Sequence, residues 1–294
     1  MVKKAVLAGG TGFIGKYVQQ QLEKRGYQVE IIARRAPAIK WNDHAGMVQA
    51  LENAEMVINL AGKTVNCRYN EENKQEIIQS RLGTTKLLGD AIQACDSPPP
   101  LWINASTATI YRHAEDRPMT EADGEIGTGF SVDVATKWEK SFFRFSLKQT
   151  RQVALRTAIV LGPNGGVATP YKNLVMFGLG GSQGDGKQMF SWIHIEDLFQ
   201  IILFLQEHEE LEGVFNCSSP HPVPNYRLMQ TLRSKLHRPL GLSAPAPLLE
   251  LGAVFLQTET ELILKSRWVL PERLQQAGYT FQYPTIGQAV DAIY

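Results

Sequence analysis

The sequence predicts an α/β fold, in which a doubly wound parallel sheet carries a smaller C-terminal α+β lobe. Short apolar runs alternate with helical patterns along residues 1–162, as in chains of βαβ units. The first apolar run leads through a glycine-rich turn into a helical pattern, which is typical of such sheets. Beyond Gly162, glycines and prolines crowd the chain, which indicates a change of organisation.

The individual elements follow from these patterns. Apolar runs predict strands over residues 2–8, 28–33, 56–61, 101–105 and 153–160. Helical patterns cover residues 13–25, 70–95, 130–147 and, near the C-terminus, 250–264. Gly26 is placed to end the first helix, and "SPPP" at 97–100 ends the second, because proline cannot continue a helix.

The bulk properties exclude several classes of function. The chain has 294 residues and a formal net charge of +1, so nothing in its charge indicates nucleic acid or an anionic membrane as a partner. No run approaches the roughly 20 apolar residues that span a bilayer. Its three cysteines are far apart and form no CxxC pair, so we expect neither a disulfide framework nor a metal site. These observations predict a cytoplasmic protein.

The turn at the start of the chain, "AVLAGGTGFIGKY", fits two glycine spacings. Gly10, Gly12 and Gly15 give G-x-G-x-x-G, whereas Gly9, Gly12 and Gly15 give G-x-x-G-x-x-G. Between a strand and a helix, either spacing favours a Rossmann-type fold that holds a dinucleotide pyrophosphate at the helix N-terminus. The alternative is an ordinary strand–turn–helix connection.

The residues after the second strand indicate which dinucleotide is bound. An acidic residue there would bind the ribose hydroxyls of NAD(H), but this chain has Arg34 and Arg35, and Glu30 lies too early in the strand. Guanidinium groups match the oxygens of a 2′-phosphate. The pattern therefore favours NADP(H), with NAD(H) less favoured; the alternative is a solvated basic turn.

Several motifs resemble the extended form of the short-chain dehydrogenase/reductase superfamily. They are "GGTGFIG", counted Gly9, Gly12 and Gly15, then "NLAG" (59–62), "RTAIVLGP" (156–163) and "GDGKQMFSWIHIEDL" (184–198). The stretches "KQEIIQSR" (74–81), "TKWE" (136–139) and "VLPERLQQAGYTFQYP" (269–284) resemble one atypical subgroup. That subgroup is sugar-nucleotide-epimerase-like and has a C-terminal domain of unknown function.

The change of composition after Gly162 predicts a division of the chain, and the resemblance implies a set of cofactor contacts. We expect residues 1–162 and 191–217 to form the NADP(H)-binding domain, and residues 163–190 and 218–294 the smaller substrate or cap lobe. The implied cofactor-binding residues are Gly9, Thr11, Gly12, Phe13, Ile14, Gly15, Ala33, Arg34, Arg35, Leu60, Ala61, Gly62, Glu76, Arg81, Ser106, Lys137 and Val160.

The superfamily's catalytic groups are matched only in part. A Ser or Thr, a Tyr-x-x-x-Lys pair and an Asn are usual, and the lysine makes the tyrosine a useful acid/base near neutral pH. Here Thr107 and Lys137 match, but Asp133 stands at the tyrosine position and Ser80 at the asparagine position. Asp133 is either a functional carboxylate or the partner of Lys137 in a surface ion pair.

Two further residues are candidates for acid/base work. Tyr111 follows the predicted strand at 101–105 and is a candidate replacement acid, although packing is the more usual role of such a residue. His194 lies in "SWIHIED", where a structural role is favoured over a base. The arginine that holds the substrate diphosphate in nucleotide-sugar enzymes is replaced by "FSW" (190–192), which favours a less anionic substrate or a more apolar pocket.

Three functions remain open at this point. The first is an NADP(H)-dependent oxidoreductase or epimerase acting on a small carbonyl or sugar-type substrate with an unusual acid/base. The second is a non-catalytic NADP(H)-binding sensor or scaffold, which the missing tyrosine favours. The third is a structural protein with a decayed cofactor site. The chain is expected to be a monomer, or a homodimer formed through the helices at 70–95 and 130–147.

Overall fold

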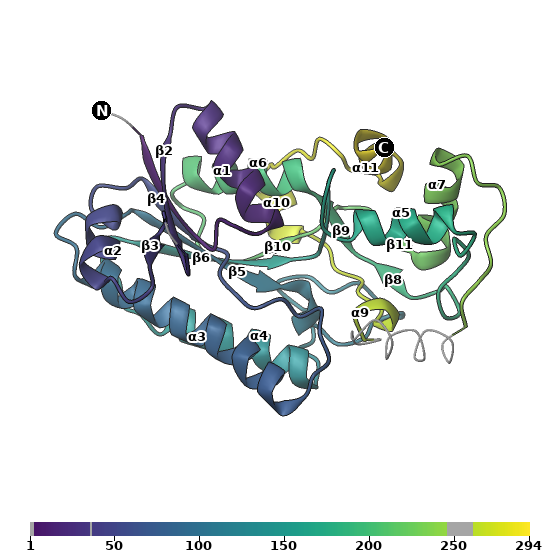
Figure 1. The fold of residues 1–294 in the computed structure, drawn as a ribbon, viewed down its shortest axis with the longest axis horizontal. Coiled ribbons are helices and arrows are strands. Elements are labelled where there is room, and N and C mark those ends of the chain that lie inside the picture. Colours follow the sequence, from purple (N-terminus) through teal and green to yellow (C-terminus); the bar gives the residue numbers. More distant parts are fainter. Residues whose placement is uncertain (1–2, 36, 246–260) are drawn as a thin grey trace.

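The computed structural model describes residues 3–35, 37–245 and 261–294. Its centre is a parallel sheet of seven strands in the order β10-β6-β5-β4-β1-β2-β3 (Figure 1). The strands are β1 (Lys4–Ala8), β2 (Gln28–Ala33), β3 (Ile39–Lys40), β4 (Met56–Asn59), β5 (Leu101–Thr107), β6 (Arg151–Thr157) and β10 (Gly213–Cys217). The order reverses between β1 and β4, and a crevice opens at the carboxyl ends of strands at such a switch point.

Helices cover both faces of the sheet, so the predicted doubly wound fold is confirmed. Figure 1 shows α1 (Phe13–Lys24), α6 (Ile195–Glu207) and α10 (Glu272–Gln276) on one face. The other face carries α2 (His44–Leu51), α3 (Glu71–Gln93) and α4 (Phe130–Phe143). Strand residues alternate between two buried cores: Leu7 packs in the core that contains Phe199, and Val6 in the core that contains Phe142.

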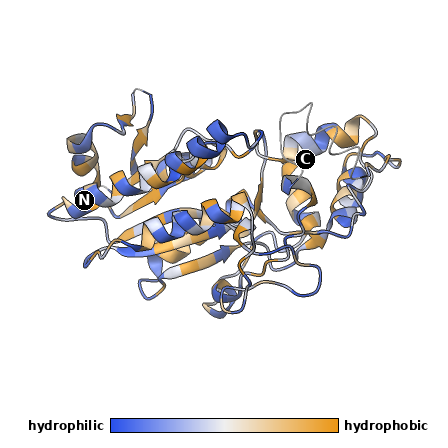
Figure 2. Ribbon diagram, turned by 90° about the horizontal axis from the view of Figure 1, so that it is seen from below, coloured by the Kyte–Doolittle hydropathy of each residue, from blue (hydrophilic) through white to orange (hydrophobic). Residues whose placement is uncertain are grey.

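The helices are amphipathic, which explains how the sequence produces two covered faces. Figure 2 shows hydrophilic and hydrophobic residues in stripes along them. In α1, Val18 and Leu22 are buried against the sheet, and Gly26 ends the helix region in the left-handed conformation at φ +82°. In α3, Asn70 accepts a hydrogen bond from the Asn73 N–H and so begins the helix.

A smaller lobe follows the sheet, as predicted. It contains β8 (Met189–Phe190), which pairs with β11 (Val223–Pro224), and the helices α5 (Ala168–Met176), α7 (Asn225–Lys235) and α11 (Ile286–Ile293). Residues from these helices share a hydrophobic core with Phe190 and Trp192. Figure 1 shows this lobe beyond the end of the sheet, with the C-terminus in it.

One predicted strand needs correction, and most of one predicted helix lies outside the described residues. The strand expected over 153–160 is divided: β6 ends at Thr157, and β7 (Ile159–Leu161) pairs instead with β9 (Trp192–His194) in a separate sheet. The chain leaves the large sheet at Ala158, whose N–H donates to the Cys217 carbonyl. Of the helix expected over 250–264, residues 250–260 lie outside the described residues, and Glu261–Leu264 form α9.

No helix of the described chain is long and apolar enough to cross a bilayer.

The limits of the two long helices are close to the predicted ones. Helix α3 was expected over 70–95 and α4 over 130–147. The observed α4 ends earlier, at Phe143, while Phe145 turns back to pack against Trp102.

Candidate functional site

In the glycine turn between β1 and α1, the glycines differ in their surroundings. Gly9 has φ +78°, and a Cβ there would lie 2.7 Å from the Ala61 backbone, so only glycine fits. A Cβ on Gly15 would lie 2.6 Å from the Cα of Gly10. Because Gly15 has no side chain, α1 is able to pack closely against the turn. Gly10 itself is confined by the side chains of Ile31 and Leu7.

Gly12 differs from the other glycines of this turn because no atom of the described chain crowds it. Within the described chain, a Cβ there would meet only the Gly9 carbonyl oxygen, at 3.9 Å, and φ is an ordinary −78°. Gly12 is the N-cap of α1, where no described side chain caps the helix and the first turn carries no acidic residue. Room and uncapped N–H groups coincide here, so the turn fits a phosphate group.

The residues around Gly12 line the same turn. Thr11 is exposed and Ile14 is half-buried against the sheet. Phe13 lies under a second glycine-rich loop, where a Cβ on Gly165 would lie 2.3 Å from the Phe13 ring. Val160 is half-buried at the start of that loop.

Strand β2 lies beside β1, and two basic residues follow its carboxyl end. Ala33 is buried at the end of the strand, and Arg34 and Arg35 are both exposed. In the described part of the chain, neither arginine makes an ion pair or a side-chain hydrogen bond. Both guanidinium groups are therefore available to an anion, which fits a phosphate on the cofactor ribose.

The loop after β4 is held from below by Arg81 of α3. Its Nη1 donates to the carbonyls of Lys63 and Ile77, each at 3.1 Å, and its guanidinium lies 5.0 Å from the centre of the Trp138 ring. Burial lowers the pKa of Arg81 to about 10. The Arg81 guanidinium packs closely under this loop: a Cβ on Gly62 would lie only 3.1 Å from it. Arg81 thus supports the backbone of Leu60, Ala61 and Gly62.

Two other side chains of α3 hold the same loop. Glu76 is exposed and forms an ion pair with Lys63. Ser80, at the superfamily's asparagine position, accepts a hydrogen bond from the Lys63 N–H at 2.9 Å and donates to the Ile77 carbonyl at 3.1 Å. Ser80 therefore fixes the backbone of the loop.

The matched catalytic residues lie at the ends of β5 and on α4. Thr107 is half-buried at the end of β5, and its Oγ1 accepts from the Thr109 N–H at 3.1 Å. Lys137 and Asp133 are exposed on α4. Within the described residues they form no ion pair with each other, so the surface ion pair considered for them is not observed.

Ser106 and Tyr111 lie in a buried polar network rather than on an open surface. Ser106 Oγ donates to Glu139 at 2.6 Å, and Glu139 accepts two hydrogen bonds from Arg156, at 2.9 and 2.8 Å. Arg156 also donates to the Tyr111 hydroxyl at 2.9 Å, and that hydroxyl donates to Asn216 Oδ1 at 2.9 Å.

This network argues against two of the predicted roles. Successive strand residues point to opposite faces, so Ser106 faces α4 while Thr107 faces the other way. Tyr111 is 1% exposed, both sides of its hydroxyl are occupied, and burial raises its pKa. The structure therefore supports neither Ser106 as a cofactor contact nor Tyr111 as the replacement acid.

His194 is a structural residue, as favoured from the sequence. It is 5% exposed, its Nδ1 accepts from the Glu196 N–H at 3.2 Å, and its ring lies 4.0 Å from that of Tyr283. Burial lowers its pKa to about 4, so the ring is neutral at pH 7. Among the described side chains, no group of three or more His, Cys, Asp or Glu is arranged to hold a metal ion.

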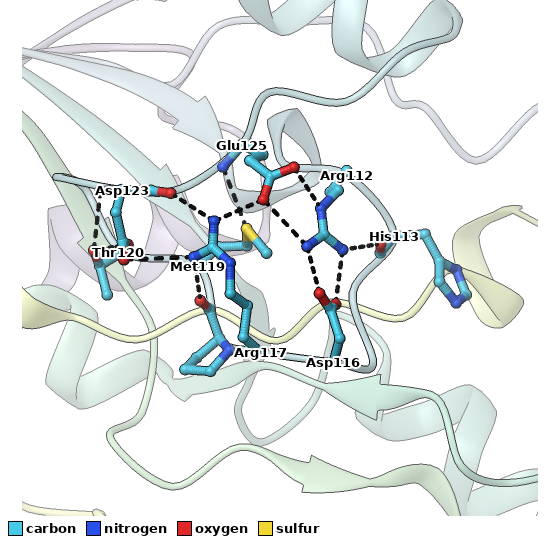
Figure 3. A network of polar contacts seen from close by, with 9 residues as sticks. Arg112, His113, Asp116, Arg117, Met119, Thr120, Asp123 and Glu125 are labelled. Atoms are coloured by element: carbon cyan, nitrogen blue, oxygen red, sulfur yellow. Dashed lines mark hydrogen bonds and ion pairs between the residues drawn. The ribbon is translucent and has the colours of Figure 1, made fainter.

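The connection between β5 and α4 carries a second, exposed polar network (Figure 3). Arg112 pairs with Asp116 at 2.8 Å and with Glu125 at 3.0 Å, and Arg117 pairs with Glu125 at 2.6 Å. These groups are solvated, and their partners hold the pKa values of Asp116 and Glu125 below the usual range. The network ties the connection to itself.

Sequence reasoning missed two basic residues that the fold brings to the site. Lys265 and Arg267 lie in the C-terminal segment, yet Lys265 Nζ donates to the Thr109 carbonyl at 2.8 Å and Arg267 Nε to Thr109 Oγ1 at 3.1 Å. A separation of more than 150 positions from Thr109 leaves no local signal. In the sequence, the two cations are only seen to flank Ser266, which does not indicate that they lie near Thr109.

The C-terminal and N-terminal parts match different known families. Residues 5–130 match the NAD dependent epimerase/dehydratase family, and residues 244–293 match a domain of unknown function, DUF1731. The N-terminal match agrees with the dinucleotide turn at Gly9–Gly15, and the C-terminal match with the predicted subgroup.

Relatives align along nearly the whole chain. The human epimerase family protein SDR39U1 is 33% identical over 301 residues, which cover 99% of both chains. An epimerase family protein of Staphylococcus aureus is 30% identical over 298 residues, covering 99% of this chain and 98% of the relative.

Solved structures show the same fold. The crystal structure of human SDR39U1 (isoform 2) with NADPH has a TM-score of 0.90 and 32% identity, covering 99% of this chain and 98% of that one. At 16% identity, the UDP-glucose 4-epimerase of Thermotoga maritima with UDP-glucose shares the fold, with a TM-score of 0.74 and 98% coverage of both chains. This chain therefore belongs to the epimerase family that includes human SDR39U1.

Proposed function

We propose that this protein binds NADP(H) in the crevice between β1 and β4 and acts as an oxidoreductase or epimerase on a small carbonyl or sugar-type substrate. The observation that carries the proposal is Gly12 at the N-cap of α1, whose missing side chain leaves room that no atom of the described chain fills. The NADPH in the structure of human SDR39U1 supports it, because that relative aligns with this chain end to end.

Each part of the crevice has a defined task in this proposal. The turn at Gly9–Gly15 binds the pyrophosphate through backbone N–H groups, and the dipole of α1 favours its negative charge. Arg34 and Arg35 bind the 2′-phosphate that distinguishes NADP(H) from NAD(H). Leu60, Ala61 and Gly62 form the opposite wall, which Arg81 supports from below.

The chemical step is assigned to the ends of β5 and α4. The nicotinamide supplies or accepts a hydride when the cofactor is bound. Thr107 Oγ1 holds the oxygen of the reacting carbon, and Lys137 orients the nicotinamide ribose. Because Tyr111 is buried in a network and the tyrosine position holds Asp133, the proton passes through Asp133 or water.

A direct binding experiment tests the cofactor assignment. We expect Arg34→Ala to weaken NADPH binding by about tenfold or more, because charge-assisted hydrogen bonds to phosphate are lost. NADH binding is expected to be unchanged, since NADH lacks that phosphate. Fluorescence titration with both cofactors measures the effect, and equal losses for NADPH and NADH would remove the 2′-phosphate assignment.

The exposed Asp133 keeps a second function in view, a non-catalytic NADP(H) sensor. The aspartate side chain is shorter than that of tyrosine. In water its carboxyl group is already ionised at neutral pH and so is a poor acid, and it cannot simply replace the tyrosine. Single-turnover oxidation of NADPH with a panel of aldehydes, ketones and sugar nucleotides separates the two functions. Turnover that Lys137→Ala abolishes supports the enzyme; tight NADPH binding with no turnover on any of them supports the sensor.

A further inference from the structure

The smaller lobe carries an exposed apolar surface at the tips of two loops. Figure 1 shows α5 and α7, which precede these loops, at the opposite end of the molecule from α2. Among the described residues, the most exposed large apolar side chains are Phe177, Leu240 and Leu242, at 81%, 84% and 71%. Met176 and Leu179 are also exposed, at 44% and 42%. We call these residues the apolar tips.

Backbone hydrogen bonds hold the two loops side by side. The Leu242 N–H donates to the Gly178 carbonyl at 2.8 Å, and the Gly181 N–H donates to the Leu242 carbonyl at 3.0 Å. Gly241 packs directly on the first loop, because a Cβ there would lie 2.6 Å from the Gly180 carbonyl carbon. The apolar tips therefore belong to one surface, although the whole of α7 lies between the two loops in the sequence.

The charges of these loops and their helices have one sign. Residues 168–184 and 225–245 contain no aspartate or glutamate, and their cations are Lys172, Arg227, Arg233, Lys235 and Arg238. The nearest acidic residue along the chain, Asp185, is followed by Lys187. Asp291 of α11 pairs with Lys235 at 2.9 Å. Lys172 and Arg238 are exposed, and in the described part of the chain neither pairs with a carboxylate.

This local charge is hidden in the composition of the whole chain. The net charge of +1 is an average, and for that reason it gave no indication of an anionic membrane as a partner. Acidic residues gather elsewhere, for example at Glu207, Glu209, Glu210 and Glu212 near the end of α6. Positive charge beside exposed apolar side chains is the combination that favours an anionic membrane surface.

The shape of the apolar tips favours a membrane over a protein helix as the partner. Helices and peptides bind in grooves, whose apolar residues are partly covered by their neighbours. Phe177 and Leu240 instead protrude, since each is more than 80% exposed. A Cβ on Gly178, next to Phe177, would meet no described atom within 4 Å. Protruding apolar side chains are readily buried at the boundary of headgroups and acyl chains, while nearby cations stay among the headgroups.

We propose that the apolar tips dock this protein on the surface of an anionic lipid bilayer. Phe177, Leu240 and Leu242 enter the interfacial layer, and Lys172 and Arg238 contact lipid phosphates. The attachment is peripheral, at the depth of the headgroups. It is independent of the proposed reaction, because no residue of the glycine turn or of the end of β5 takes part.

Sedimentation of the full chain with lipid vesicles tests the proposal. One vesicle is phosphatidylcholine alone, and the other contains equal parts of phosphatidylcholine and anionic phosphatidylglycerol. We expect binding to the anionic vesicle to be about tenfold or more tighter, because anionic headgroups attract each nearby lysine and arginine. Added salt is expected to weaken this binding, since it screens the charges. Equal binding to the two vesicles, or binding to neither, would overturn the proposal.

Matched variants test the apolar contribution. Phe177→Ser/Leu240→Ser removes two protruding side chains and is expected to weaken binding to the anionic vesicle by about tenfold or more. The control is Phe143→Ser/Ile126→Ser, which removes exposed apolar side chains of the same kinds, 38% and 49% exposed, outside the lobe. It is expected to leave the affinity within about twofold. Equal losses in the two variants would show that the apolar tips are not the docking surface.

A second pair of variants tests the contribution of charge. Lys172→Gln/Arg238→Gln is expected to weaken binding to the anionic vesicle by about tenfold. Lys140→Gln/Lys148→Gln lowers the net charge by the same amount at exposed positions in and after α4, and is expected to change the affinity by about twofold or less. If both pairs have the same effect, the attraction is diffuse and the proposed contact is wrong.

Analytical ultracentrifugation without vesicles tests a second copy of the chain as the occupant. The wild-type protein and Phe177→Ser/Leu240→Ser are expected to have the same mass in solution. A wild-type dimer that becomes a monomer in this variant would make the apolar tips a subunit interface and overturn the proposal. NADPH titration of the same samples keeps the two proposals apart: vesicle binding without NADPH binding contradicts the proposed function alone, and NADPH binding without vesicle binding contradicts only the docking surface.

Discussion

The two sides of the switch point between β1 and β4 differ in how their residues are used. On the β1 side, Gly12 leaves open room and Arg34 has no partner in the described chain. On the β5 side, Ser106, Glu139, Arg156 and Tyr111 satisfy one another in a buried network. The comparison teaches that the residues around Gly12 are open to a ligand, whereas Tyr111, one of the two acid/base candidates, is used to hold the fold.

The largest effect that this comparison predicts is on stability, at Glu139. Glu139 and Arg156 are 11% and 12% exposed, so Glu139→Ala would leave a buried arginine without its carboxylate. We expect a loss of about 3–5 kcal/mol in the free energy of unfolding, measured by urea denaturation. The fraction that remains folded is expected to bind NADPH normally.

The exposed network of Figure 3 supplies the control for this variant. Glu125 also accepts from two arginines, Arg112 and Arg117, but it is 52% exposed. Glu125→Ala is the same substitution in water and is expected to have a much smaller effect. Equal destabilisation by both variants would show that burial of the Glu139–Arg156 pair is not what makes it matter.

The next effect is a pH dependence from His194. Its pKa of about 4 lies below the value near 6.5 of an unfolded chain, so the unfolded state binds more protons between these pH values. Stability is therefore expected to fall by about 3 kcal/mol as the pH drops from about 6.5 to 4. Thermal or urea unfolding at several pH values measures the slope.

A substitution assigns that slope to His194. In His194→Asn the cap of α6 is kept, because asparagine is a good N-cap, but the titration is removed. The slope is expected to flatten in this variant and to persist in His44→Asn, which changes an exposed histidine. An unchanged slope in His194→Asn would rule out His194 as its source.

A smaller effect is expected at Tyr111. Tyr111→Phe keeps the buried ring but removes the hydroxyl that joins Arg156 to Asn216. The loss of these hydrogen bonds is expected to cost about 1–2 kcal/mol in the free energy of unfolding. Turnover, once a substrate is found, is expected to be retained; its complete loss with a normal fold would restore Tyr111 as the acid.

Local patterns predicted most of the fold and the glycine turn, because the signals there lie within short stretches of chain. The strand Gln28–Ala33 has the predicted limits, and α1 and α3 differ from theirs by one or two residues. The glycine turn was predictable because strand, glycines and helix follow one another. The role of Gly9, pressed against Ala61, needed the structure only for its confirmation.

The remaining features depend on contacts between distant parts of the chain. The expected strand 153–160 is divided because Ile159–Leu161 pairs with β9, some thirty positions later. Arginine is usually found at the surface, and only the packing of α3 against Trp138 of α4 buries Arg81. Lys265 and Arg267 reach Thr109 through the C-terminal segment, so no pattern near the glycine turn or near β5 indicates them.

The central claim is that the room at Gly12 belongs to a bound cofactor. Gly12→Ala tests it, because Gly12 has an ordinary φ of −78° and a new Cβ would meet only the Gly9 carbonyl oxygen, at 3.9 Å. We expect the free energy of unfolding, measured with urea, to change by less than about 1 kcal/mol, while NADPH affinity in a fluorescence titration falls by about tenfold or more. Unchanged NADPH affinity in a normally folded Gly12→Ala protein would contradict the claim.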